Sequence, residues 1–457
     1  MRWLWTIAAV FILAGPGVAS EKPNVLFITV DDLNDWVGCL GGHPQVKTPN
    51  IDRLADQGVL FTNAQCQAPI CNPSRASFMT GLLPSITGVY GNKRNFRKVP
   101  GFQDVVTLPQ HFAAHGYRTY GVGKVFHSRF PDEVSFQNNG PRPGFGPFPK
   151  KKLSYPRPPK LWDWGAIYTD EEMGDAKVAG WFLRELPHLK KSQPFFFAVG
   201  FYRPHVPMYA PRRWFDLYPL ETVKLPPTLD GDRDDLPEAA KRLTFNGSAP
   251  QHEWFVKNGE WKHAVQSYLA SVSFVDNQIG RVLDALSESP FRDNTIVVLL
   301  SDHGWHLGEK KQWAKRTLWE RATRVPLIIS VPNGLRGAKS TRPVGLVDLY
   351  PTLIELCALG AKPELNGQSL KPLLTDPGAE WERPAITTFK QGNHALRSEH
   401  FRYIRYADGS EELYDHRTDP NEWYNLVGDP AYENVIVRHR RWLSDFTSQA
   451  GRSRGDR

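Results

Sequence analysis

The sequence predicts an α/β fold in which helices flank one large mixed, mostly parallel sheet. A small C-terminal subdomain is expected to follow, with a short antiparallel sheet and a helix. Apolar, β-branched runs alternate along the chain with segments whose apolar positions recur at helical spacing. Past residue 374 these runs give way to short segments of mixed character. We therefore predict a main domain over residues 21–375 and a subdomain over residues 376–457.

Buried strands are predicted from runs that are apolar throughout, because the strands of a parallel sheet are covered on both faces. Residues 24–30, with the sequence NVLFITV, form the first of these runs. Runs of the same kind occupy residues 117–122, 195–199, 295–300 and 325–331.

Helices are predicted between these runs from capping signals and from apolar spacing. The segment Thr107-Leu108-Pro109-Gln110 has the form of a capping box with proline in the first turn. From residue 267 to residue 289, Val, Ile and Leu recur at helical intervals. Asp348 is expected to cap a further helix that stops at Gly360.

Two long stretches and the C-terminal part interrupt this alternation. Residues 130–164 are rich in Pro and Gly, and residues 204–261 are irregular and polar. Long loops of this kind are often functional, and we expect them to rim the ends of the strands. The subdomain is expected to place strands at 385–390, 400–405 and 411–414, and a helix at 432–448.

The first 20 residues have the pattern of an export signal. Arg2 precedes an apolar stretch that is too short to span a bilayer, and the small residues Val18-Ala19-Ser20 follow it. We expect the signal to be removed and the chain to be exported, to a periplasm or by secretion; a retained amphipathic anchor is the alternative. No later run is long enough for a transmembrane segment.

The net charge indicates which substrates suit the protein, and the number of cysteines indicates which class of fold is excluded. The formal net charge is +8, which suits an anionic substrate by electrostatic steering, although a generally basic surface is the alternative. No extended lysine-rich run or stacked aromatic-basic motif indicates nucleic acid as a partner. The chain has only four cysteines, so it is not a disulfide scaffold.

Polar clusters follow four of the predicted strands. They are Asp31-Asp32, Lys124 with His127, His205, and Asp302-His303. Ligands bind outside the carboxyl ends of strands in open α/β sheets, so we expect these side chains to converge there. Clustered carboxylates repel one another, and a hard divalent cation would compensate them. Ca²⁺ is the expected ion and Mg²⁺ the second choice, while the histidine keeps Zn²⁺ open.

The segment from Cys71 to Gly81 contains the sharpest motif. Cys71 is expected to open a helix, with Pro73 in the first turn and Arg75 one turn on. This setting favours anions and is expected to lower the pKa of the thiol. A Cys66–Cys71 disulfide or an ordinary thiol at a helix cap are the alternatives.

A resemblance to a known family decides between these readings. Cys71-x-Pro73-x-Arg75, continued by Thr80-Gly81, is similar to the sulfatase signature, whose cysteine a separate maturation enzyme oxidises to formylglycine. The chain resembles type I sulfatases of the alkaline phosphatase superfamily, and the iduronate-2-sulfatase branch in particular. The motifs that carry this likeness are VDDL at 30–33, GKVFH at 123–127, RPHVP at 203–207 and SDHGW at 301–305.

The resemblance implies an alkaline-phosphatase-like sandwich and a role for each candidate residue. The implied Ca²⁺ ligands are Asp31, Asp32, Asp302, His303 and the modified Cys71. Arg75 and Lys124 would hold the formylglycine, and His127 would be the base that allows sulfate to leave. Lys315 and His205 would bind the sulfate, and His205 would protonate the leaving sugar oxygen. Trp305 would shape the sugar pocket, or would be a core residue beneath it.

The expected reaction is hydrolysis of a sulfate ester on an acidic sugar, with iduronate 2-sulfate as the first candidate. A sulfated carbohydrate is the expected substrate, and marine polysaccharides such as ulvan are an alternative. A formylglycine-dependent phosphodiester or phosphonate monoester hydrolase is a second possibility. A glycan-binding protein that keeps the fold without the modified cysteine is a third.

Overall fold

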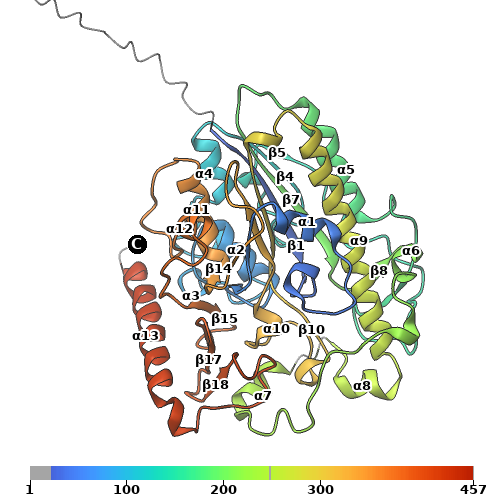
Figure 1. Cartoon of the computed structure of the whole chain (residues 1–457), viewed down its shortest axis with the longest axis vertical. Coiled ribbons are helices and arrows are strands. Elements are labelled where there is room, and N and C mark those ends of the chain that lie inside the picture. The colour runs from blue at the N-terminus through green and yellow to red at the C-terminus, as the bar shows by residue number, and fades with distance from the viewer. Residues whose placement is uncertain (1–21, 246, 248, 456–457) are drawn as a thin grey trace, which may run out of the picture.

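The computed structural model describes residues 22–455 apart from residues 246 and 248, so the export signal expected at 1–20 lies outside the described residues. An eight-stranded sheet with the order β13-β2-β12-β9-β1-β7-β4-β5 runs through the middle of the molecule (Figure 1). In that order the strands are Ala338–Ser340, Val59–Phe61, Leu327–Ser330, Thr295–Ser301, Asn24–Asp31, Phe195–Pro204, Arg118–Gly123 and Asn138–Asn139.

The middle of this sheet is parallel. In β1, Ile28 lies opposite Val199 of β7 and Leu299 of β9, and both pairings are parallel. The strand β12 pairs antiparallel with both β9 and β2. The prediction of a mixed, mostly parallel sheet is confirmed, and all five apolar runs named above form strands in it.

The alternation of side chains along β1 explains why helices cover both faces of the sheet. Val25 and Phe27 belong to one apolar core, and Leu26 and Ile28 belong to another on the opposite face. The first core contains residues of α2 (Cys71–Thr80), α4 (Leu108–Ala114) and α11 (Leu349–Leu356). The second contains residues of α1 (Pro49–Asp56), α5 (Gly174–Glu185) and α9 (Trp261–Glu288). Figure 1 shows these two groups of helices on either side of the sheet.

The predicted helices form, with shifted ends. The capping box at Thr107 and Gln110 is present at the start of α4. The helix α9 begins at Trp261, six residues before the expected start, and buried apolar residues at helical spacing, such as Ala264 and Val265, already occur in its first turns. The helix α11 ends at Leu356 rather than Gly360, and Ala358 already has a positive φ of 52°.

The C-terminal part forms a four-stranded antiparallel sheet and a long helix, which lie side by side in Figure 1. The strands are β15 (Ala385–Thr388), β16 (His394–Arg397), β17 (Phe401–Arg405) and β18 (Glu411–Asp415), and the helix is α13 (Glu433–Gly455). The strand β16 was not expected from the sequence. Leu396 and Tyr403 share an apolar core with Phe27 of the large sheet, so the two parts pack together without a gap. The division at residue 375 stays a prediction.

The remaining elements are short. The other strands are β3 (Ala64–Gln65), β6 (Trp164–Ala166), β8 (Met208–Ala210), β10 (His306–Leu307), β11 (Trp313–Ala314) and β14 (Val344–Gly345). The other α-helices are α3 (Pro84–Thr87), α6 (Arg212–Phe215), α7 (Glu238–Thr244), α8 (His252–Lys257), α10 (Glu320–Thr323) and α12 (Lys371–Thr375). Within the described residues, none of the helices combines the length and the hydropathy that a bilayer crossing needs.

Candidate active site

The carboxyl ends of four strands bring the predicted polar clusters to one edge of the sheet. Asp31 ends β1, Asp302 directly follows β9, Lys124 directly follows β4 and His205 directly follows β7. A cavity of about 380 Å³ opens at this edge, with Cys71 in its wall. The predicted residues that line the same cavity are Lys124, His127, His205, Trp305 and Lys315.

Cys71 is the first residue of α2, and its side chain is buried. Its Sγ lies 3.1 Å from Lys315 Nζ, 3.3 Å from His303 Nε2 and 3.8 Å from Lys124 Nζ. A thiol is a weak hydrogen-bond acceptor, so the two ammonium groups offer more donors than one sulfur can use. These surroundings fit a residue that carries oxygen atoms at this position, such as formylglycine.

The expectation of a lowered thiol pKa at Cys71 was wrong. Burial raises the pKa of the Cys71 thiol above its ordinary value, and the nearby Asp31 carboxylate raises it further, while Lys124 and Lys315 act in the opposite direction. Desolvation therefore outweighs the favourable position at the helix start, and an unmodified thiol here would be a poor nucleophile. Cys66 and Cys71 are both free, so no disulfide joins them.

Arg75 lies one turn into α2 and is fully buried beneath the cavity. Its Nε donates to Asp302 Oδ2 at 2.8 Å, and its Nη2 donates to Asp31 Oδ1 at 3.2 Å. Its Nη1 donates to the backbone carbonyls of Val125, at 3.0 Å, and of Lys124. One guanidinium thus ties α2 to the ends of β1, β4 and β9. In the structure Arg75 positions the carboxylates, and it does not itself line the cavity.

A group of ligand atoms beside residue 71 has the spacing of a metal site. Atoms of Asp31, Cys71, Asp302 and His303 lie within 4.8 Å of one another. The ring of His303 pairs through Nδ1 with its neighbour's carbonyl, that of Gly304, at 3.0 Å. When Nδ1 donates this hydrogen bond, the lone pair of Nε2 is free for a metal ion.

Asp32 provides the independent sign that a cation belongs here. Its Oδ2 is buried and has no hydrogen-bond partner among the described residues. Burial raises the pKa of Asp32 to about 8, although the Lys315 ammonium lies against it. Asp31 differs, because Lys124 and Arg75 outweigh its burial and hold its pKa well below the ordinary value. The carboxylates therefore fit a divalent cation that prefers oxygen ligands, such as Ca²⁺.

His205 is held at the cavity by residues that the sequence reasoning did not single out. The guanidinium of Arg203 donates to the carbonyls of His205, at 3.2 Å, and of Phe145, at 2.6 Å. The ring of Phe145 stacks on His205, with centroids 4.4 Å apart. The Nε2 of His205 lies 3.7 Å from Asp32 Oδ2. Burial, with Lys315, lowers the pKa of His205 well below the ordinary value, so the ring is neutral in the absence of substrate.

His127 also lines the cavity, and its Nδ1 accepts a hydrogen bond from the backbone N–H of Arg129 at 3.3 Å. Burial, with Lys124, lowers the pKa of His127 to about 3, so this ring is neutral. A base must have a free lone pair, and the lone pair of this tautomer lies on Nδ1. Proton transfer to His127 would therefore break the hydrogen bond from Arg129.

Trp305 is both a buried residue and part of the cavity wall, and its role toward a sugar stays a prediction. Lys315 Nζ lies 5.3 Å from the centre of its ring. Sequence reasoning missed several other lining residues, although it expected the long loop at 130–164 to rim the strands. The missed residues are Asn92, Arg129, Phe145, Lys160, Leu161 and Trp162. For the four of these residues that lie within 130–164, the one signal was the Pro- and Gly-rich composition of that loop, and nothing in the sequence indicated Asn92 or Arg129.

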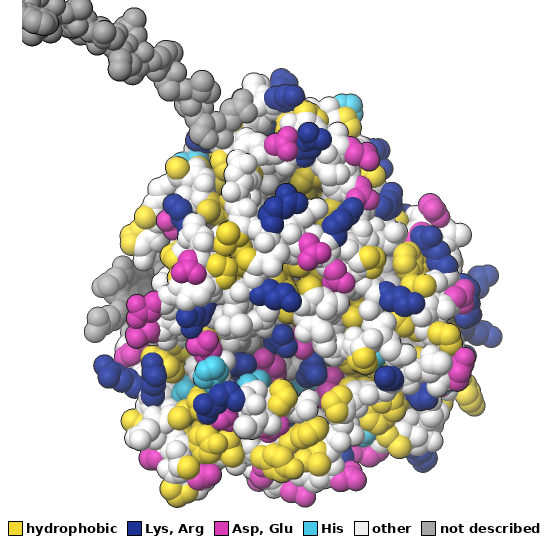
Figure 2. Space-filling view, viewed as in Figure 1, with side chains coloured by type: hydrophobic (Ala, Val, Ile, Leu, Met, Phe, Trp, Pro, Cys, Tyr) yellow, Lys and Arg dark blue, Asp and Glu magenta, His cyan; other side chains and the backbone are white. Residues whose placement is uncertain are grey.

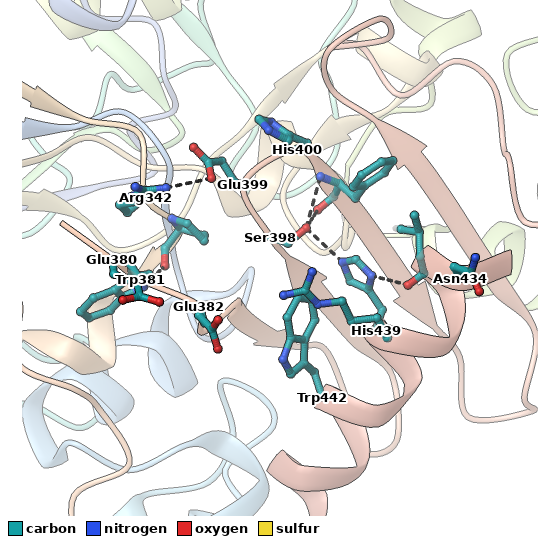
Figure 3. A pocket seen from close by; sticks show the side chains of 14 residues that line it. Arg342, Glu380, Trp381, Glu382, Ser398, Glu399, His400, Asn434, His439 and Trp442 are labelled. Carbon is teal, nitrogen blue, oxygen red and sulfur yellow. Dashed lines mark hydrogen bonds and ion pairs between the residues drawn. The ribbon is translucent and has the colours of Figure 1, made fainter. Parts of the chain in front are cut away.

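A larger cavity of about 520 Å³ lies elsewhere, between α13, β17 and the segment before β15 (Figure 3). Four of its polar side chains form two pairs with one another. His439 bridges Ser398 Oγ and the carbonyl of Val435, and Arg342 pairs with Glu399, as the dashed lines in Figure 3 show. It contains none of the predicted site residues, so the smaller cavity is the candidate active site.

Comparison with known proteins agrees with this geometry. Residues 23–359 match the family model described as Sulfatase, and residues 308–449 match the model described as N-sulphoglucosamine sulphohydrolase, C-terminal. A "Sulfatase" of Formosa agariphila is 45% identical over 434 residues, which cover 91% of this chain and 85% of the relative. The "Iduronate 2-sulfatase" of Mus musculus is 35% identical, with 92% of this chain and 93% of the relative covered.

The fold has close counterparts among solved structures as well. The phosphonate monoester hydrolase of Silicibacter pomeroyi superposes with a TM-score of 0.78 at 25% identity, over 94% of this chain and 96% of that one. The predicted fold class and the resemblance to sulfatases are thereby confirmed. The chain belongs to the sulfatase family of hydrolases.

Proposed function

We propose that this sulfatase removes sulfate from a sulfated uronic acid, with iduronate 2-sulfate as the first candidate, and that it uses Ca²⁺ and a formylglycine made from Cys71. The observation that carries the proposal is the set of groups around residue 71. Two ammonium groups and an imidazole surround its side chain, and a buried carboxylate oxygen beside it lacks a partner. A thiol would form few interactions with these groups, whereas an oxygen nucleophile together with a cation would interact with all of them.

The chain's own residues have distinct tasks in this proposal. Asp31, Asp32, Asp302 and His303 would hold the cation together with residue 71. The cation and formylglycine, when present, supply a metal-activated oxygen nucleophile at neutral pH. Lys124 and Lys315 reach residue 71 from two sides, so they can hold its oxygens and the sulfate that approaches it.

Departure of the sugar needs a proton donor, and we assign this task to His205. Its ring lies at the cavity, and its Nε2 is directed toward the carboxylates. The neutral ring of the substrate-free protein cannot donate from Nε2 while Nδ1 bonds to the carbonyl of Val206. A bound sulfate ester adds negative charge nearby and favours the imidazolium form, which can donate. Binding and protonation are thereby coupled.

The acidic sugar is supported by the lining of the cavity and by the relatives. The lining includes Lys124, Arg129, Lys160, Lys315 and Arg316, and it includes no Asp or Glu. A site of this charge attracts a substrate with a second anionic group besides the sulfate. The mouse relative named iduronate 2-sulfatase acts, by its name, on such a sugar.

Two measurements test the proposal. Mass spectrometry of the peptide around Cys71, in protein made together with a maturation enzyme, is expected to show the aldehyde in place of the thiol. The same protein is expected to hydrolyse an aryl sulfate and a 2-sulfated uronide faster than an aryl phosphate. An unmodified thiol in active protein, or faster turnover of the phosphate ester, would refute it.

A second candidate is a phosphonate monoester hydrolase, because a structure with this activity in its name superposes over 94% of the chain. The two candidates differ in the charge and size of the group attacked. Comparing kcat/KM for the phenyl monoester of a phosphonate and for phenyl sulfate separates them without any assumption about the sugar, because both substrates release phenol.

We also propose that residues 1–20 direct export and are removed. The expected mature chain begins at Glu21, in a periplasm or outside the cell. N-terminal sequencing of protein recovered from the host's exported fraction tests this, and an intact Met1 in that fraction would contradict it.

A further inference from the structure

A segment beside the cavity is strongly and exclusively basic. Residues 141–162 carry six Lys or Arg and no Asp or Glu. By contrast, on the face in Figure 2, Lys and Arg side chains are interspersed with Asp and Glu. Arg142 pairs with Glu133 at the start of the segment. Four further basic residues are exposed and form no ion pair with a described residue, namely Lys150, Lys151, Arg157 and Lys160. We call residues 150–161 the basic loop.

The basic loop is fixed by its own hydrogen bonds. The remaining lysine, Lys152, donates from Nζ to the carbonyls of Pro158 and Lys160, each at 2.6 Å, and of Trp162 at 3.0 Å. The buried Asp163 accepts from the backbone N–H groups of residues 153 and 154, and from the hydroxyls of Ser154 and Tyr209. A charge buried in this way holds the loop in one shape. The exposed cations are therefore presented on a preorganised surface, which lowers the entropy cost of binding.

The basic loop is continuous with the catalytic cavity. Lys160, Leu161 and Trp162 line that cavity together with Cys71. Trp162 packs against Trp305, with ring centroids 5.6 Å apart. Further out, the ring of Tyr155 is 83% exposed. Exposed aromatic and basic side chains on one rigid loop suit a chain of sugars that bears carboxylate or sulfate groups.

We propose that the basic loop binds the neighbouring residues of a polyanionic polysaccharide whose terminal sulfated sugar lies in the catalytic cavity. This inference rests on the proposed function and extends it from a single sugar to a chain. Because the loop shares residues with the cavity, one ligand can occupy both at once. A membrane surface would also attract a basic loop, but it offers no group that would enter the cavity, so the polysaccharide is the occupant that the geometry favours.

A matched pair of variants tests the charge of the loop. K150Q/K151Q removes two adjacent exposed lysines from it. K190Q/K191Q removes two adjacent exposed lysines that precede the amino end of β7, the end opposite the cavity. We expect K150Q/K151Q to raise KM for a sulfated hexasaccharide roughly fivefold more than KM for an aryl sulfate, as two lost surface ion pairs predict. We expect K190Q/K191Q to change both KM values equally. Equal effects of the two variants would overturn the proposal.

Tyr155 gives a second, charge-independent test. Y155A is expected to weaken hexasaccharide binding to an inactive C71S protein, measured by calorimetry, whereas Y424A removes another exposed tyrosine, 58% accessible, without effect. If the loop variants instead weaken only binding to phosphatidylserine vesicles, the surface serves a membrane and the inference is wrong. Absent turnover of every sulfate ester by wild-type protein with confirmed formylglycine would refute the proposed function, while loop-dependent binding of the hexasaccharide could still be seen.

Discussion

Among the described residues, two buried groups of charged side chains have the residue types and spacing of a metal site. One is the site cluster at the cavity, built on Asp31, Asp32, Asp302 and His303. The other is the interface cluster between α10 and the C-terminal sheet, which consists of Glu320, Arg397, Arg402, His416 and Glu422. They differ in whether their carboxylates are already satisfied.

In the interface cluster every carboxylate has partners. Arg402 contacts both Glu320 and Glu422, Arg397 Nε lies 3.3 Å from Glu320 Oε2, and His416 Nε2 lies 3.0 Å from Glu422 Oε1. Burial opposes the charge of Glu320, but Arg397 and Arg402 outweigh it and hold its pKa well below the ordinary value. In the site cluster the pKa of Asp32 is raised to about 8, and its Oδ2 has no partner among the described residues.

The contrast shows how a functional cluster can be told from a structural one that has the same composition. A structural cluster supplies its own counter-charges, and nothing is left for a ligand. A functional cluster keeps a buried carboxylate without a full set of partners until a ligand binds. The unpaired group lowers the stability of the ligand-free protein. Substitutions should therefore affect activity in the site cluster and stability in the interface cluster.

The largest expected effect is that of D32N on turnover. The change removes the carboxylate that we assign to the cation, and we expect kcat for an aryl sulfate to fall roughly 10³-fold. Because burial raises the pKa of Asp32 to about 8, the ionised carboxylate destabilises the folded metal-free protein at neutral pH, so D32N is expected to raise, not lower, the unfolding free energy of that protein. Turnover and urea denaturation on the same preparation check both statements.

The control for D32N is D276N. Asp276 is a buried aspartate whose carboxylate accepts hydrogen bonds from the backbone N–H groups of Asn50 and Ile51 at the start of α1, away from the cavity. D276N is expected to lower stability and leave kcat of the folded protein unchanged. Equal losses of kcat in both variants would mean that the Asp32 carboxylate has no specific role in turnover.

The next largest expected effect is a loss of stability with activity retained, and we expect it in the interface cluster. R402M removes the guanidinium that lies between two buried glutamates, and uncompensated buried charges typically cost about 3 kcal/mol. We expect that loss in urea denaturation, with kcat per folded molecule retained. R417M is the matched control, because Arg417 pairs with Asp415 at the surface and its side chain is 54% exposed. A loss of stability no larger than that of R417M would show that the interface cluster is not structural.

Calcium separates the two clusters directly, since both have the spacing of a metal site. Free Ca²⁺ at a hundred times its dissociation constant should raise the unfolding free energy of the wild type by about 2.7 kcal/mol. D32N should lose this response and H416A should keep it, because His416 belongs to the cluster that is already satisfied. Differential scanning calorimetry with and without a chelator measures it. The opposite pattern would place the cation in the interface cluster.

The same distinction explains how far the sequence could predict the molecule. Five strands of the large sheet were predictable because burial on both faces leaves continuous apolar runs, such as residues 24–30, whereas the short strands β2, β5 and β13 were not predicted. The site cluster was predictable because polar pairs interrupt those runs at their carboxyl ends, as Asp31-Asp32 does. In each case the signal lies within a few neighbouring residues.

Features that depend on distant partners were not predictable. The interface cluster joins Glu320 to Arg402 across 82 positions, and neither residue stands out in its own segment. The raised pKa of Cys71 arises from burial and Asp31, although its position at the start of a helix indicated the opposite. The cavity residues Lys160 and Leu161 lie in a loop whose composition predicted a rim but not which side chains would reach inward.

The smallest expected effect is the pH dependence of the interface cluster. The pKa of Glu320 is depressed in the folded state, so its contribution to stability is present above the ordinary glutamate pKa of about 4.3 and is lost as pH falls below it. E320Q removes the titration, and we expect its loss of stability between pH 6 and pH 3 to be smaller than that of the wild type by about 1 kcal/mol. E355Q serves as the control, since Glu355 forms a half-exposed surface pair with Lys371 and should leave the profile unchanged. Urea denaturation across this pH range gives the comparison. Parallel profiles for the wild type and E320Q would mean that Arg397 and Arg402 do not hold this carboxylate in its charged form.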